Sequence, residues 1–412
     1  MRGNLLFAPI ALTLACGAST VTAQSGVEQP PAWPHQRGFH EALLFVHPLV
    51  NYAVPPDRQV AWERERLAAG ALLGGFGSVS TDDLMIDAHW ALNPVLGRGL
   101  RLRNRIDWQQ LRHLPRDRLD IELGFEATLW HGVGAVVTSS PAAAKEDLDL
   151  QVGGVWTSAD RTRYVQVRYV AEDLVHDEKN DRGAQTRTSP RGVDWQLRLT
   201  RSAWTVASEG RWLCTFDRIY PDLHRSGGLA RHRFADNELT VRVDRRLGEG
   251  GPAGGGLVQA SFLLVEHREA RAYRDVAFDH DVSGRFRSLS LRGLWPLDGR
   301  WRLRGELHRL DRRADGAGWR AFRYRRDETI PAVLVQRSFG MHHAEAGYVA
   351  TFYRWREESA NGSVRQDDGY ADKVMASFVL ALARGSELQF SVSHEVSDGD
   401  FGGGSIQVLA YF

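Results

Sequence analysis

The sequence predicts an all-β fold: a single antiparallel up-and-down β-barrel of about 18 strands, with about 16 as the alternative. Two observations predict this fold. Apolar residues recur at every second position along most of the 412 residues, and helical periodicity is rare. Short turns alternate along the chain with long polar connections, which places the long connections together at one end of a barrel.

The N-terminus has the features of a secretory signal peptide, predicted over residues 1–23. Arg2 precedes an apolar run over residues 5–14, and a stretch of small residues follows up to Ala23. In the alternative, Cys16 is acylated as in a lipoprotein, but lipoprotein sites prefer Leu where this chain has Thr13. Cleavage at either site leaves Cys214 with no intramolecular disulfide partner.

Residues 24–82 are predicted to be an N-terminal segment that leads into the barrel. Residues 24–37 are rich in proline and indicate a periplasmic tail, and residues 57–69 are the one candidate for a short helix, which would cap or plug the pore. The first strand is expected in residues 39–52 or 67–79. The barrel then occupies residues 83–412.

About 17 further strands are expected after residue 83, which gives 18 in total because bacterial barrels have an even number. Residues 119–129 show the pattern, since Leu119, Ile121 and Leu123 alternate with polar residues or glycine. The expected short turns are 157–160, 202–204, 297–300 and 384–386. The expected long connections are 173–192, 217–236, 268–284, 311–329 and 357–371.

The last eight residues, Ser405 to Phe412, place Ile406, Val408, Ala410 and Phe412 on one face of a strand that ends on an aromatic. This ending resembles the C-terminal signature of Gram-negative outer-membrane β-barrels of porin-like type. The resemblance implies a transmembrane barrel in the outer membrane, reached by signal-peptide-dependent secretion. It also implies that Phe412 addresses the barrel-assembly machinery, that the short turns are periplasmic, and that the long loops are extracellular and meet lipopolysaccharide.

If the apolar residues of each strand face lipid, the alternate residues face the lumen. Arg101, Arg103 and Arg105 then oppose Glu122 and Glu126 of the next strand, which predicts cross-strand pairs. Other residues predicted to face the lumen are Gln166, Arg168, Asp194, Arg198, Arg242, Asp244, Arg292, Arg302, Arg304, Glu306 and His308.

The charged lumen suggests a selectivity ladder. Its arginine candidates for guiding an anionic solute are Arg101, Arg103, Arg105, Arg302 and Arg304, and Glu122 and Glu126 would set the transverse field. In the alternative reading, these charges neutralise each other in a hydrated lumen. The net charge of +1 argues against a nucleic-acid binder.

We expect no cofactor, no metal site and no enzymatic activity. His394 beside Asp372 is a candidate for a lipid hydrolase, but the sequence places no serine nucleophile on the same face. His342 and His343 are adjacent and would point to opposite faces of a strand. The segment 398–400 (Asp-Gly-Asp) is ordinary turn chemistry, with contact to calcium as the alternative.

The resulting hypothesis is an outer-membrane channel that passes or exports a hydrophilic, anionic solute through a lumen of arginine and acidic side chains. Three alternatives stay open: a polysaccharide-export barrel, a lipid-modifying enzyme of the outer leaflet, and a plugged structural or assembly barrel. The identity of the solute and the oligomeric state are not predicted by the sequence.

Overall fold

The computed structural model describes residues 56, 71–79, 84–97, 99–111, 118–141, 147–160, 162–176, 186–188, 191–214, 216–221, 229–248, 255–273, 276–318, 321–383, 386–397, 399 and 401–411. From residue 71 onward this part of the chain consists of strands and turns. None of its residues belongs to a helix that is long and apolar enough to cross a membrane. The predicted signal peptide, Cys16, the tail, the helix at 57–69 and Phe412 lie outside the described residues.

One sheet contains all 21 strands, and all but three of them form a ring. The 18 ring strands are β1 (Ala71–Val79), β2 (Leu84–Leu92), β4 (Leu100–Leu111), β5 (Arg118–Trp130), β6 (Val133–Pro141), β7 (Asp147–Thr157), β8 (Arg163–His176), β10 (Arg191–Arg201), β11 (Trp204–Leu213), β13 (Leu229–Leu247), β14 (Gly256–Tyr273), β15 (Val276–Pro296), β16 (Trp301–Gly318), β17 (Phe322–Phe339), β18 (His342–Ser359), β19 (Val364–Ala383), β20 (Ser386–Glu395) and β21 (Phe401–Tyr411). The three short additions are β3 (Val95–Gly97), β9 (Thr186–Thr188) and β12 (Phe216–Pro221).

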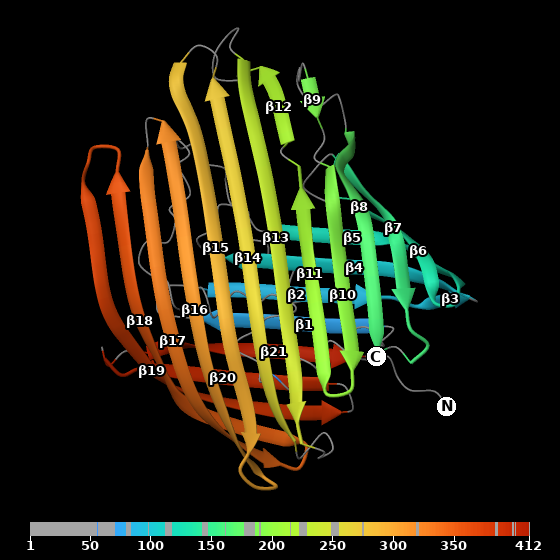
Figure 1. Ribbon diagram of the computed structural model, residues 1–412, viewed down its shortest axis with the longest axis vertical. Helices are drawn as coiled ribbons and strands as arrows, with labels where there is room; N and C mark the ends of the chain where they lie inside the picture. The colour runs from blue at the N-terminus through green and yellow to red at the C-terminus, as the bar shows by residue number, and fades with distance from the viewer. Residues whose placement is uncertain are drawn as a thin grey trace.

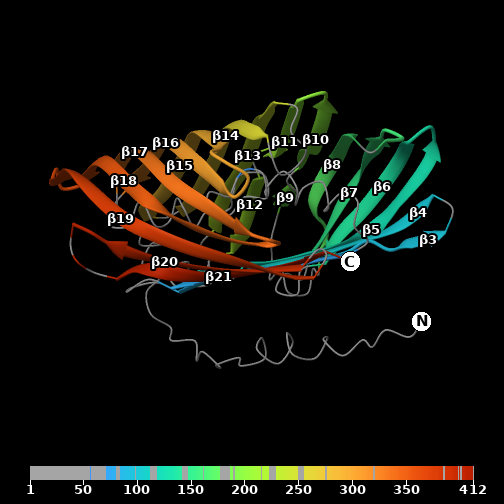
Figure 2. The same cartoon turned by 90° about the horizontal axis from the view of Figure 1, so that it is seen from below.

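Each ring strand pairs antiparallel with the next one, and β1 pairs with both β2 and β21. The closing register runs from Leu72 opposite Tyr411 to Val79 opposite Gly404. The ladder therefore returns to its start and leaves no ring strand with an unpaired neighbour. Figures 1 and 2 show the long strands β13–β18 in one wall and β1, β2, β4 and β5 in the wall that crosses behind it.

The chain is thus an 18-stranded up-and-down barrel, as predicted, and the alternative of 16 strands is wrong. Strand β1 lies within one of the two stretches in which the first strand was expected, residues 67–79.

We call the end of the barrel that carries the hairpins β5–β6, β10–β11 and β17–β18 the turn end. Each of these hairpins turns within two residues. His131 and Gly132 show why so short a turn is possible, since both adopt a positive φ, of 44° and 80°. The predicted turns at 157–160, 202–204 and 297–300 are confirmed and lie at this end, whereas residues 384 and 385 are outside the described part of the chain.

We call the opposite end the arm end, because strands β13 to β19 extend far toward it. The expected loops at 268–284, 311–329 and 357–371 are wrong: most of their residues belong to strands of 18 to 21 residues. The loops at 217–236 and 173–192 are also shorter than expected, because β12, β13, β8 and β9 take up part of them. A strand of 21 residues is about 69 Å long. It has about twice the roughly 9 to 11 residues that a strand needs to cross a bilayer.

The prediction failed because both faces of the arms are polar. Along β17, Arg323, Arg325 and Asp327 face outward while Arg326 and Glu328 face inward and are buried. The apolar alternation ends there although the hydrogen-bonded ladder continues into β18. Apolar alternation marks where a strand contacts lipid and does not mark where the strand ends.

Candidate lumen and outer face

The outward face of the barrel is apolar and exposed. On β17, Val333 is 56% exposed, whereas Gln336 on the opposite face is 3% exposed. Exposed apolar side chains occur on nearly every ring strand, including Trp90, Phe125, Val137, Val152, Val167, Val193, Trp204, Leu291, Leu307, Val333, Tyr348, Val374, Phe390 and Ile406. This distribution is the reverse of that in a water-soluble sheet, which buries its apolar face.

Aromatic side chains border the apolar surface at both ends. At the turn end, the guanidinium of Arg337 lies 5.0 Å from the ring centre of Trp301 and 4.8 Å from that of Phe339, and Arg245 lies 5.0 Å from that of Trp204. Toward the arms, Phe352 and Tyr370 form the second border, with ring centres 5.2 Å apart.

The width of the apolar band follows from the register. Phe339 on β17 marks its turn end, and Thr329, which pairs with Phe352, marks its arm end. The distance between them along the strand is about 33 Å, which at a tilt of about 40° spans about 25 Å, the height of the apolar band of outer-membrane barrels.

A continuous hydrogen-bonded chain of charged and amide side chains covers the inner wall from β13 to β18, and we call it the β13–β18 network. Arg242 pairs with Asp244 (Nη2–Oδ2 2.9 Å), and Gln259 donates to the same carboxylate at 2.9 Å. Arg292 Nη1 donates to Gln259 Oε1 at 3.1 Å. The register places these strands side by side, so a polar residue at every second position meets its partner on the next strand.

Glu306 on β16 is the centre of this network. Its Oε1 accepts from Arg292 Nε at 2.7 Å and from Arg304 Nε at 2.6 Å, and its Oε2 lies 3.1 Å from His308 Nε2. Arg304 continues the chain to Glu345 on β18, with Nη1 to Oε1 at 2.6 Å. The side chain of Arg292 is 0% exposed and that of Glu306 4%, so the centre of the network is shielded from solvent.

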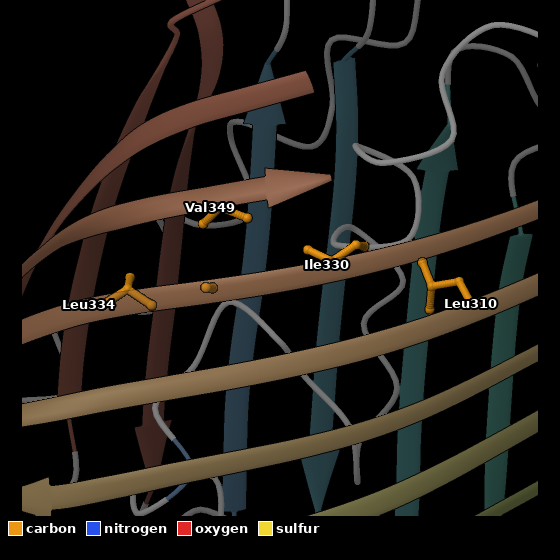
Figure 3. Close-up of a cluster of buried hydrophobic side chains, with 5 residues drawn as sticks. Leu310, Ile330, Leu334 and Val349 are labelled. Carbon is orange, nitrogen blue, oxygen red and sulfur yellow. The ribbon is translucent and has the colours of Figure 1, made fainter. Parts of the chain in front are cut away.

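The interior is not purely polar, in contrast to the expectation from the alternation. Leu310, Ile330, Leu334 and Val349 form a buried apolar cluster on β16–β18 (Figure 3). Their positions share the face of Arg304 and Glu345, and a Cβ at Gly347 would lie 2.6 Å from Leu334 Cγ. Leucine therefore packs over bare glycine backbone here and helps to exclude water from the β13–β18 network.

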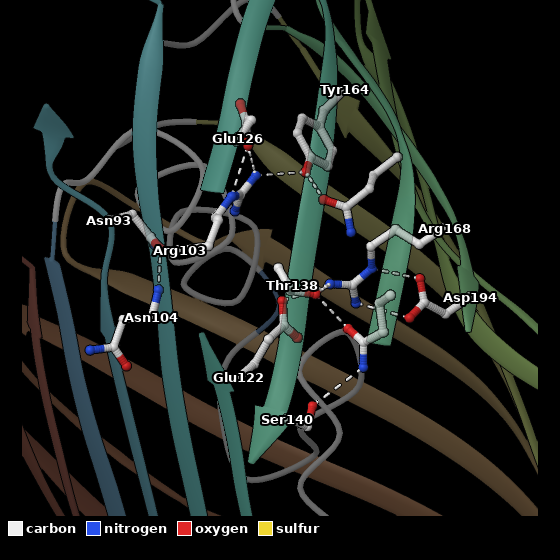
Figure 4. A network of polar contacts seen from close by, with 12 residues as sticks. Asn93, Arg103, Asn104, Glu122, Glu126, Thr138, Ser140, Tyr164, Arg168 and Asp194 are labelled. Atoms are coloured by element: carbon white, nitrogen blue, oxygen red, sulfur yellow. Dashed lines mark hydrogen bonds and ion pairs between the residues drawn. The ribbon is translucent and has the colours of Figure 1, made fainter. Parts of the chain in front are cut away.

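A second group of contacts, the β4–β10 network, joins neighbouring strands and also strands that are not neighbours in the ring (Figure 4). Arg103 on β4 binds Glu126 on β5 through Nε at 2.8 Å and Tyr164 on β8 through Nη2 at 3.0 Å. Arg168 on β8 binds Glu122 on β5 at 2.6 Å and Asp194 on β10 through two bonds of 2.8 and 2.9 Å. These long side chains reach over β6 and β7, so the network spans the inner surface of the wall.

The structure divides the candidate selectivity residues into two groups. Arg103, Arg304, Glu122 and Glu126 face inward and take part in the ion pairs described above. Arg101 and Arg302 share that face and are half-buried, and Arg105 is exposed. The two rows lie opposite each other as predicted, since Arg101 is in register with Glu126 and Arg105 with Glu122, and the ion pair between the rows joins Arg103 to Glu126.

Three residues of the networks were missed by sequence reasoning: Tyr164, Gln259 and Glu345. Each one continues an inward alternation, as Gln259 does between Leu257 and Ser261 on β14. That alternation was available in the sequence, but their partners depend on the register between strands.

The candidate hydrolase residues lie on the outer face near the arm end. His394 is exposed and pairs in register with Val374. Asp372 accepts from the hydroxyl groups of Ser397 and Tyr348. Ser397 therefore directs its hydroxyl proton to Asp372, so the structure does not present it as a nucleophile activated by His394.

Among the described residues, no group of three or more His, Cys, Asp or Glu side chains is arranged to hold a metal ion. His343 is buried in the lumen face of β18, whereas His342 lies on the other face, where its Nδ1 accepts from the Ala381 backbone at 3.2 Å. Asp398 and Asp400 are outside the described residues, and Gly399 between them has a φ of 74°.

No protein-family model matches this chain, and no curated protein sequence matches it. Among solved structures, it is similar to OmpT of Vibrio cholerae lacking loop L8 (9% identity, covering 83% of this chain and 97% of that one, TM-score 0.38). It is also similar to a bacterial polysaccharide outer membrane secretin (11%, 83% and 98%, 0.36) and to the outer membrane channel DcaP of Acinetobacter baumannii (11%, 83% and 98%, 0.34).

Proposed function

We propose that the protein is an outer-membrane β-barrel channel that passes or exports a hydrophilic solute. One observation carries the proposal: the closed ring has an exposed apolar outer face about 25 Å high and charged residues on its inner face. An apolar outer face over so many strands would be unfavourable in contact with water, whereas contact with lipid tails would stabilise it.

The ion-pair networks determine which charged side chains can contact a solute in the lumen. Arg103 and Arg304 hold the wall together, so the residues that meet the solute are Arg101, Arg105 and Arg302, which are less buried. The preference for anions would come from these three arginines, because their side chains are more exposed than the charged groups of the β13–β18 network.

A plugged structural or assembly barrel is the second candidate, and the burial of Arg242 and Arg292 at 0% exposure favours it. In that case the β13–β18 network is part of a filled interior that conducts nothing. The two candidates predict different electrical behaviour in a bilayer.

Single-channel conductance of the refolded protein in planar bilayers with asymmetric salt separates them. A channel gives discrete conductance steps with anion preference, and the double change Arg101→Ser and Arg105→Ser reduces that preference. Arg268→Ser is the matched control, because Arg268 lies on the outer face of β14 and pairs with Asp281 at 3.0 Å. Wild-type protein that migrates as a folded, heat-modifiable barrel but gives no conductance steps contradicts the channel and supports the plugged barrel.

A further inference from the structure

Four arginines lie side by side on the outer face of the arms. The register pairs Arg285 on β15 with Arg313 on β16, Arg313 with Arg325 on β17, and Arg325 with Arg356 on β18. All four side chains are exposed and belong to the outward alternation of their strands, which are neighbours in the wall (Figure 1). We call this line of side chains the arginine row.

The arginine row is unfavourable without a ligand. Residues directly opposite each other on neighbouring strands have Cβ atoms about 5 Å apart, and like charges at such positions repel. Arg313 and Arg325 each have a like-charged neighbour on both sides. A bound anion would relieve this repulsion along the whole row.

Carboxylates beside the row orient three of the arginines without covering them. Arg285 binds Glu266 at 2.9 Å, Arg313 binds Asp311 at 3.1 Å and Arg356 binds Glu358 at 2.7 Å. The three arginine side chains nevertheless stay 43%, 47% and 54% exposed. Their guanidinium groups therefore remain accessible from the surroundings of the barrel.

Arg325 is the fourth member, and it forms no ion pair with any residue in the described part of the chain. The carboxylates of its neighbourhood bind other arginines, since Asp327 pairs with Arg309 at 3.3 Å and Asp315 with Arg323 at 3.4 Å. The row thus contains one guanidinium more than the carboxylates that bind its members. Its charge is complementary to an anion.

The height of the row above the apolar band limits which anion reaches it. Arg356 follows Phe352, which borders the band, by four residues on β18. Four residues span about 13 Å along a strand, or about 10 Å of height at a tilt of about 40°. The headgroup layer of a bilayer adds only about 5 to 8 Å on each side of the hydrocarbon. A phosphate on a sugar headgroup therefore fits this level better than a phosphate attached to glycerol.

We infer that the arginine row binds a lipid of the outer leaflet whose sugar headgroup carries more than one phosphate. The planar fork of arginine binds phosphate oxygens through two hydrogen bonds. The pair Arg285–Arg313 and the pair Arg325–Arg356 have centres two strand spacings, or about 10 Å, apart, so two phosphates of one headgroup can each bridge one pair. The acyl chains lie along the exposed Leu307 and Val333 below the row.

This inference rests on the proposed function, because it requires the outer face of β15–β18 to be embedded in a bilayer. It also takes the arm end as the extracellular side, where lipopolysaccharide is expected. The test is native mass spectrometry of the full-length protein released from micelles that contain equal amounts of three lipids: an acylated glucosamine disaccharide with two phosphates, the same lipid without phosphate, and phosphatidylglycerol. Wild-type protein is expected to retain the lipid with two phosphates above both others, and excess inorganic phosphate does not displace it.

Variants on and beside the row then test the assignment. Arg313→Gln with Arg325→Gln lowers the retention of the phosphorylated lipid by about fivefold, the effect of losing two exposed charge pairs. Glu358→Gln raises the retention, because it removes a carboxylate that competes for Arg356. Arg201→Gln with Arg245→Gln is the matched control, since it removes the same charge from exposed positions at the turn end and leaves retention unchanged.

The outcomes separate this inference from the function on which it rests. If a wild-type barrel that inserts into bilayers retains the lipid with two phosphates no better than the other two lipids, or loses it to inorganic phosphate, the inference alone is overturned. Equal losses in the row variant and in the turn-end control, or lowered retention in Glu358→Gln, also overturn it. Wild-type protein that neither inserts nor migrates as a heat-modifiable barrel overturns the proposed function.

Discussion

Replacing Glu306 by glutamine is expected to destabilise the barrel strongly, because Glu306 is the shared partner of two buried arginines. Arg292 and Arg304 donate to the same carboxylate oxygen at 2.7 and 2.6 Å, and the side chains of all three residues are at most 4% exposed. Glu306→Gln keeps the shape and one acceptor oxygen but removes the negative charge. Removing one partner of a buried ion pair costs about 3 to 5 kcal/mol, and Glu345 can compensate only Arg304.

The assay is urea unfolding of the protein in lipid vesicles, followed by tryptophan fluorescence and by heat-modifiable migration. Asp281→Asn is the control, since its pair with Arg268 is about half exposed and its loss costs less than about 1 kcal/mol. Adding Arg304→Gln to Glu306→Gln removes one of the two arginines that have lost their carboxylate partner. The double variant is therefore expected to lose less stability than the two single variants together, by at least about 1 kcal/mol. A loss of stability in Glu306→Gln no larger than that in Asp281→Asn would refute the role of the β13–β18 network.

Three further predictions concern other parts of the wall. Changing Arg101 and Arg105 to Ser reduces the anion preference of the conductance by about twofold or more and lowers the urea midpoint less than Glu306→Gln does, because Arg101 is half-buried and Arg105 is exposed. A midpoint lowered as far as in Glu306→Gln would count against the distinction. Gly153→Val prevents formation of the heat-modifiable barrel, because a Cβ there would lie 2.0 Å from the Val167 carbonyl oxygen. Gly154→Val is the control and folds normally, because the atom nearest to a Cβ at Gly154 is 3.9 Å away. Hydrogen bonds from Ser158 and Thr162 lower the pKa of Asp160 to about 2 from 3.8. Asp160→Asn is therefore expected to reduce stability above about pH 4, and this loss disappears as the pH falls through about 2. Thermal melting of the wild type and the variant at pH 6 and at pH 2 would show the difference.

The strand number and the turn positions were predictable because both depend on patterns local to the chain. Each membrane-crossing strand has an apolar face, and the turns at 202–204 and 297–300 interrupt that alternation with residues suited to tight turns. Asp298 illustrates the turn chemistry, since its Oδ1 accepts from the backbone N–H of Arg300 and Trp301 at 2.7 and 2.8 Å. The extent of the arms was not predictable from alternation, because lipid imposes no polarity beyond the apolar band.

The candidate site was predictable as a face but not as a set of partners. Alternation placed Arg103 and Arg304 in the lumen, and it opposed the rows of β4 and β5 correctly. Pairs such as Arg168 with Glu122 join strands separated by two others, so they depend on the curvature of the closed wall. Periodicity contains no information on curvature, and the arginines that bind buried partners could not be told in advance from those that line an open surface.

The measurement that tests the central claim most directly is the lipid exposure of successive positions along β17. Nitroxide labels are attached at Val333→Cys, Leu334→Cys and Val335→Cys in a Cys214→Ser background, and collisions with oxygen are compared with collisions with a water-soluble nickel chelate in vesicles. Val333 and Val335 are exposed and Leu334 is buried, so the account predicts high oxygen accessibility at 333 and 335 and low accessibility to both reagents at 334. Greater accessibility to the nickel chelate than to oxygen at 333 and 335 would show that the apolar face is not in lipid and would contradict the barrel as a membrane protein.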